Sequence, residues 1–175
     1  MIKTFALGSA LALTLSAAAY AQGAAAPTDP QIAHIAYTAG QLDIAAAKQA
    51  LQKSRNKQVR AFAQEMVRDH TAVNNQALAL VKKLNVTPQD NPTSESLTKA
   101  AEQKRADYAR LNGKAFDRAY VQNEVAFHKT VNGALESTLI PDARNGELKS
   151  LLSTGLKLFQ EHEQHAAHLA MQLKS

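Results

Sequence analysis

The residues best suited to chemistry in this chain are acids and histidines that interrupt apolar helical patterns. His70 is the clearest case, because it falls between Met66 and Val73 in a series of apolar residues three and four positions apart. Such a series marks one buried face of a helix, and Asp69 lies directly beside His70. Similar groups occur in the other long segments. The candidates for a shared site are Asp43, His70, Glu124, His128 and His162.

Two interpretations fit these five groups. Burying a charge or an imidazole without a partner costs several kcal/mol, so the groups must meet one another or a ligand. As metal ligands, with much imidazole and few acids, they favour a mononuclear site for Fe, Zn, Cu or Ni. Di-metal bundles use Glu-x-x-His pairs, whereas this chain has Glu-x-x-x-His at 124–128 and 161–165. Without a metal, the groups would form a hydrogen-bonded network that fixes the helix register.

The remaining histidines and methionines are weaker candidates for metal ligands. Met66 and Met171 lie four and three residues from a histidine, and a thioether beside an imidazole would suit copper. We expect Met66 to be part of the apolar core instead. His34 is predicted to lie at the surface, and His168 at the edge of its helical stripe.

Composition excludes several kinds of chemistry. The chain has no Cys, which excludes disulfides, thiolate catalysis and zinc–sulfur sites. It has no Gly-x-Ser-x-Gly and no glycine-rich phosphate loop, so nucleophilic catalysis and nucleotide binding have little support. Lys and Arg number 20 against 15 acids, and this mild excess is spread along the helices. We therefore expect a solvated surface and no nucleic-acid partner.

The first 21 residues predict an export signal. Lys3 provides a positive start, residues 5–19 are almost uninterruptedly apolar, and Ala19 and Ala21 are the small residues that a signal peptidase recognises. The apolar run is short for a membrane span, which needs about 20 residues. We expect cleavage after Ala21, a periplasmic protein without an integral membrane segment, a flexible leader at 22–28, and one domain at 29–175.

Periodicity and turn signals divide that domain into helices. Apolar residues recur at helical spacing over 30–53, 59–85, 95–111, 114–139 and 143–173, and Asp29, Ser54, Ser94 and Asp142 are candidate caps. No segment alternates as a strand would. The predicted fold is all-α: a ferritin-like antiparallel four-helix bundle, with the short helix 95–111 in the crossover between two hairpins. An up-and-down bundle with that helix as a lid is the alternative.

The sequence also resembles the bacterial domain-of-unknown-function family 4142. The resemblance rests on Phe62-Ala-Gln-Glu-Met-Val-Arg-Asp-His70 followed by Asn74 or Asn75, on Phe116-Asp117 with Tyr120 and His128, and on the final His162. Asp43 stands where the family commonly has Glu. The resemblance spans about residues 29–173 and implies an exported ferritin-like bundle. The family has no established activity, so the resemblance implies none.

Three hypotheses on function follow. The first is a periplasmic binding or envelope-stress protein with a central cluster of histidines and acids, rather than a turnover enzyme. The second is a metalloprotein that binds Fe, Zn or Cu through Asp43, His70, Glu124, His128 and His162. The third is a structural protein whose polar core only sets helix register. A metal ion, a second copy of the chain and an envelope component are the partners that these hypotheses imply.

Overall fold

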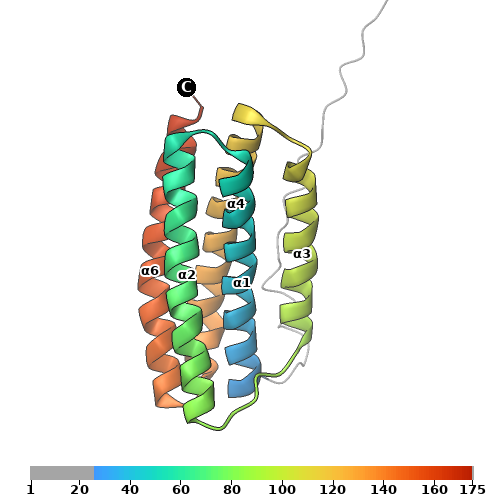
Figure 1. The fold of residues 1–175 in the computed structure, drawn as a ribbon. Helices are drawn as coiled ribbons and strands as arrows, with labels where there is room; N and C mark the ends of the chain where they lie inside the picture. The colour runs from blue at the N-terminus through green and yellow to red at the C-terminus, as the bar shows by residue number, and fades with distance from the viewer. Residues whose placement is uncertain (1–25, 175) are drawn as a thin grey trace, which may run out of the picture.

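The computed structural model describes residues 26–174, which form helices and no strand (Figure 1). The predicted signal peptide at 1–21 and leader residues 22–25 lie outside the described part. The helices are α1 (Asp29–Lys53), α2 (Lys57–Lys83), α3 (Pro92–Ala109), α4 (Gly113–Ala134), η2 (a π-helical turn, Leu135–Leu139), α5 (Ile140–Asp142) and α6 (Gly146–Gln172).

Four long helices form the bundle, and α3 packs against its side (Figure 1). The short α1–α2 and α4–α6 connections make two antiparallel hairpins. After α2 the chain runs back along the bundle through α3 before it enters α4, so α2 and α4 point the same way (Figure 1). One long crossover between two hairpins is the ferritin-like arrangement. The predicted fold class is therefore confirmed, with α3 as the extra helix.

Helix capping differs in detail from the sequence prediction. Thr28, Asn56, Asn91 and Asn145 are the N-caps, in place of the expected residues. Asp29 instead accepts hydrogen bonds from the backbone N–H groups of Arg144 and Asn145, at 2.8 and 2.9 Å. Its carboxylate thus ties the start of α1 to the start of α6. A cap is decided by which side chain reaches the free N–H groups, and several neighbouring Ser, Asn and Asp residues compete for that position.

Two apolar clusters fill the bundle, and the polar residues lie between them along each helix. The first contains Phe62, Met66 and Tyr120, and the second contains Ile32, Leu135 and Leu152. On α4, for example, Glu124 and His128 follow residues of the first cluster and precede those of the second. The predicted core position of Met66 is confirmed by its complete burial. Apolar packing on both sides therefore holds the polar layer at a fixed height in the bundle.

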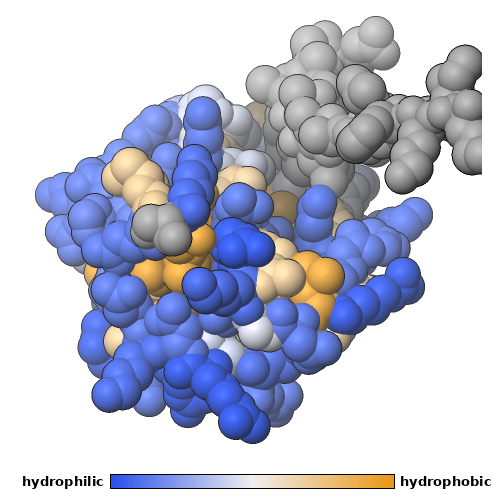
Figure 2. Space-filling model, turned by 90° about the horizontal axis from the view of Figure 1, so that it is seen from above, coloured by the Kyte–Doolittle hydropathy of each residue, from blue (hydrophilic) through white to orange (hydrophobic). Residues whose placement is uncertain are grey.

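The outer surface is polar. The end of the bundle that carries the α1–α2 connection shows mainly hydrophilic side chains with small hydrophobic areas between them (Figure 2). Within residues 26–174, no helix has both the length and the apolar character that crossing a membrane requires.

Inside the bundle, α1 and α2 approach closely at Gly40, where an added Cβ would clash with the side chain of Asn74.

Candidate metal centre

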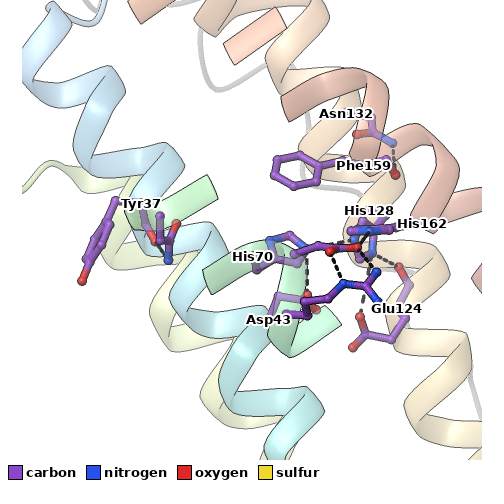
Figure 3. Close-up of polar contacts among 11 residues, drawn as sticks. Tyr37, Asp43, His70, Glu124, His128, Asn132, Phe159 and His162 are labelled. Atoms are coloured by element: carbon purple, nitrogen blue, oxygen red, sulfur yellow. Dashed lines mark hydrogen bonds and ion pairs between the residues drawn. The ribbon is translucent and has the colours of Figure 1, made fainter. Parts of the chain in front are cut away.

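All five predicted site residues are buried, and they converge from all four bundle helices (Figure 3). α1 supplies Asp43, α2 supplies His70, α4 supplies Glu124 and His128, and α6 supplies His162. Their exposed fractions range from 0 to 3%. Donor atoms of His70, His128 and His162 lie within 4.8 Å of one another, and so do those of Asp43, Glu124 and His128.

His70 is the link between the acids and the other imidazoles. Its Nε2 lies 2.9 Å from Oδ2 of Asp43 and 3.4 Å from Nε2 of His128. Nδ1 of His128 lies 3.0 Å from the backbone oxygen of Glu124. A proton on that Nδ1 would satisfy the carbonyl, which assigns a lone pair to Nε2 of His128. This lone pair faces His70.

The two buried carboxyl groups divide into a charged one and a neutral one. Burial raises the pKa of Glu124 well above its usual range, and the negative charge of Asp43 raises it further. Burial also acts to raise the pKa of Asp43, but the charge and hydrogen bond of His70 and a hydrogen bond from Glu124 outweigh it, so this pKa is lowered. Asp43 is thus the anion, and Glu124 favours its protonated form.

Burial keeps two of the imidazoles neutral. It lowers the pKa of His128. It also lowers the pKa of His162 to about 4, with a further contribution from His70 and His128. A neutral imidazole presents a lone pair, which is the form that binds metals.

An outer layer on α2 and α6 supports this centre. Oδ2 of Asp69 lies 3.2 Å from Nε2 of His162 and is itself held by Arg68, whose Nε and terminal nitrogen contact the carboxylate at 2.6 and 2.9 Å. The hydrogen bond from Arg68 is the main reason that the pKa of Asp69 is lowered. Glu65 contacts Nδ1 of His165 at 2.8 Å.

Sequence reasoning missed this outer layer. The sequence places Asp69 among the polar groups of the helical stripes but assigns it no partner, and it does not single out Glu65. The available signal was their spacing, because residues four apart on α2 face the same way and His162 and His165 on α6 are three apart. Pairing between helices shows that His165 meets Glu65 rather than Glu161, its neighbour on α6.

The other candidate ligands lie away from the centre. His168 is exposed, as is Met171 at 61%, which argues against a copper site formed by these two residues. His34 is partly exposed and pairs with Asp90 at 3.0 Å. Phe159 closes one side of the centre, with its ring stacked on that of His70 at a centroid distance of 4.6 Å (Figure 3).

The contact between His70 and Asp43 generates a stability prediction. Replacing His70 by Leu removes the partner of a buried carboxylate and should cost about 3–5 kcal/mol of unfolding free energy. Adding Asp43→Leu should recover most of this loss, because an apolar pair tolerates burial. Urea unfolding in the presence of a metal chelator measures both variants. Losses that simply add in the double variant would show that the pair is not coupled.

Two side chains of the centre, His162 and Glu124, change the stability of the protein with pH in opposite directions, and this difference generates a prediction. The lowered pKa of His162 means that the unfolded chain binds more protons between about pH 6.5 and 4, so stability falls on acidification through that window by about 3 kcal/mol. The raised pKa of Glu124 acts in the opposite sense above about pH 4.5, because there the folded protein holds the extra proton.

Replacing Glu124 by Gln keeps a neutral side chain of the same shape and removes this opposing contribution. The variant should therefore lose stability more steeply than the parent protein between pH 7 and pH 4. Titrating groups outside the polar layer affect both proteins equally and cancel in the comparison. Parallel curves of unfolding free energy against pH would contradict the raised pKa of Glu124.

Comparison with known proteins shows the family to which the sequence belongs and a solved structure that has the same fold. A solved structure of a DUF305 protein from Streptomyces coelicolor, whose name describes it as secreted, superimposes with a TM-score of 0.71 at 10% sequence identity. The superposition covers 83% of this chain and 93% of that one, and at this identity it shows a shared fold alone. No curated protein matches the sequence. Residues 14–169 match the family described as "Domain of unknown function (DUF4142)". Because that match spans most of the chain, the protein belongs to the family DUF4142.

Proposed function

We propose that this protein binds one divalent transition-metal ion in the core of its bundle. Three imidazoles, from His70, His128 and His162, would form the centre of the site, and Asp43 and Glu124 would supply the carboxylate. An imidazole-rich set with one or two carboxylates suits Zn, Cu or Fe. The function is binding rather than turnover, since the donor side chains are buried and the chain has no Cys nucleophile.

The distance between two nitrogens carries this proposal. Nε2 of His70 and Nε2 of His128 lie 3.4 Å apart and point toward each other (Figure 3). Two nitrogens bound to one tetrahedral metal at about 2.0–2.1 Å are separated by about 3.3–3.4 Å. The carboxylate of Asp43 lies against the same nitrogen of His70. The pair is thus already spaced as two ligands of one ion would be.

The protons in the cluster also support a cation. Among the described residues, Nδ1 of His162 is buried and has no hydrogen-bond partner, while Asp69 contacts Nε2 of the same ring. A carboxylate on the far nitrogen of a metal-binding histidine orients the ring and makes it a better ligand. Neither carboxyl oxygen of Glu124 accepts a hydrogen bond of normal geometry within residues 26–174. A metal would take the place of its proton.

Export belongs to the same proposal. We infer that residues 1–21 are removed as a signal peptide and that residues 29–175 act as one domain in the periplasm. The neighbouring structure is named as a secreted protein, and its fold is the same. Mass spectrometry of the mature protein from the periplasmic fraction should find Gln22 at the N-terminus. An intact residue 1 in protein from the cytoplasmic fraction would overturn this inference.

Metal binding is tested with chelator-treated protein and added Zn²⁺, Co²⁺, Cu²⁺ or anaerobic Fe²⁺. At least one of these ions should bind with one equivalent per chain and raise the melting temperature. His128→Gln and His162→Gln should each weaken binding at least tenfold. His168→Gln, an exposed histidine on the same helix as His162, is the matched control and should bind normally.

Two results would contradict the proposal. One is an absence of saturable binding for all four ions, which would leave a buried network that sets helix register. The other is binding that survives His128→Gln and His162→Gln but is lost in His168→Gln, which would place the ion at the surface.

A further inference from the structure

A large cavity lies beside the histidine cluster, within the second apolar cluster. Its volume is about 810 Å³, within the range of about 300–1,000 Å³ that small-molecule pockets occupy. All four bundle helices contribute to its wall, and α3 borders it on one side. Small side chains create much of the space, among them Ala36, Ala39, Ala77 and Gly155.

The wall of the cavity is mainly apolar. Leu, Ile, Val, Phe and Ala side chains make up most of it. Exposed residues on one side of α4 and η2, Lys129 and Glu136 among them, also border the space, so it reaches the surface there. These two rim residues carry opposite charges. The two charges offset each other at the entrance, so they do not oppose the entry of an apolar molecule.

The inner end of the cavity is polar, because His70 and His128 line it. Nδ1 of His70 is buried and has no hydrogen-bond partner within residues 26–174, while Nε2 of the same ring faces Asp43. If Nε2 donates to Asp43, Nδ1 carries a lone pair and accepts a hydrogen bond. If Nε2 binds a metal, Nδ1 carries the proton and donates. A hydroxyl group can serve either state, since it both donates and accepts.

An anionic head group would be excluded from this position. The carboxylate of Asp43 lies 2.9 Å from Nε2, on the other side of the His70 ring. Burying a second anion beside this carboxylate, in a cavity whose wall is mainly apolar, is strongly unfavourable. The cavity therefore favours a neutral ligand.

We propose that the cavity binds a small neutral molecule that is mostly apolar and carries one hydroxyl group, a phenol or an alcohol, hydrogen-bonded to Nδ1 of His70. This binding goes beyond the metal site and does not require it. The apolar body would pack against Phe159 and the aliphatic wall, and the stacked pair of Phe159 and His70 would position the hydrogen-bonding nitrogen.

Three probes that share the naphthalene ring system and differ in one substituent test the proposal: naphthalene, 1-naphthol and 1-naphthoate. Their affinities for the full protein are measured by fluorescence in the presence of a chelator, so that a failed metal site does not affect the result. 1-Naphthol should bind about five- to tenfold more tightly than naphthalene, as a hydrogen bond to a buried acceptor implies. 1-Naphthoate should bind most weakly.

Two variants of one helix locate the site. Ala77→Phe fills the cavity from α2 and should weaken 1-naphthol binding at least tenfold, whereas Ala61→Phe lies on the same helix, is exposed and borders no part of the cavity. His70→Phe keeps the stacked ring and should reduce the affinity for 1-naphthol to that for naphthalene. Equal affinities for all three probes in the parent protein, preferred binding of 1-naphthoate, or equal effects of Ala77→Phe and Ala61→Phe would each overturn the proposal.

Discussion

The contact between Asp43 and His70 is the interaction on which the rest of this structure depends. A carboxylate that is 1% exposed keeps its charge largely because an imidazole from the neighbouring helix lies 2.9 Å away. Burial raises the pKa of Glu124 and the charge of Asp43 raises it further, so the second buried acid favours its neutral form. The contact between α1 and α2 therefore influences the protonation of a group on α4. The whole polar layer behaves as a coupled unit, in which a change at one residue alters its neighbours.

This layer also separates two environments within one bundle. On one side lies the well-packed cluster around Phe62 and Tyr120, and on the other the cavity bordered by Ala36 and Phe159. Packed apolar side chains thus support the polar layer on one side, and the cavity lies on its other side. A rigid support keeps donor atoms at fixed distances, and open space admits a ligand. The cavity of about 810 Å³ is the space that the proposed neutral ligand would occupy.

The fold and the chemistry rest on different evidence. The DUF305 protein of Streptomyces coelicolor shares the bundle at 10% identity, which shows that two very different sequences adopt the same fold. Function depends on specific side chains grafted onto such a fold. For this member of DUF4142, the proposed function therefore rests on the separation of His70 and His128 and on ring nitrogens of His70 and His162 that have no hydrogen-bond partner in the described part of the chain.

The sequence by itself determined the helices, their approximate limits and the five buried polar residues, because apolar periodicity and the cost of burial are local properties that a pattern records. The short connections and the crossover implied by the proline-containing loop predicted at 87–95 were enough to choose the ferritin-like arrangement, which the structure confirms. Only the tertiary structure decided which partners meet. Asp69 pairs with His162 across 93 residues of sequence, and Glu65 rather than Glu161 pairs with His165. The apolar periodicity of the sequence did not predict the cavity either. Pairing and empty space depend on the rotation and separation of helices, and these follow from the packing of all side chains together rather than from any one segment.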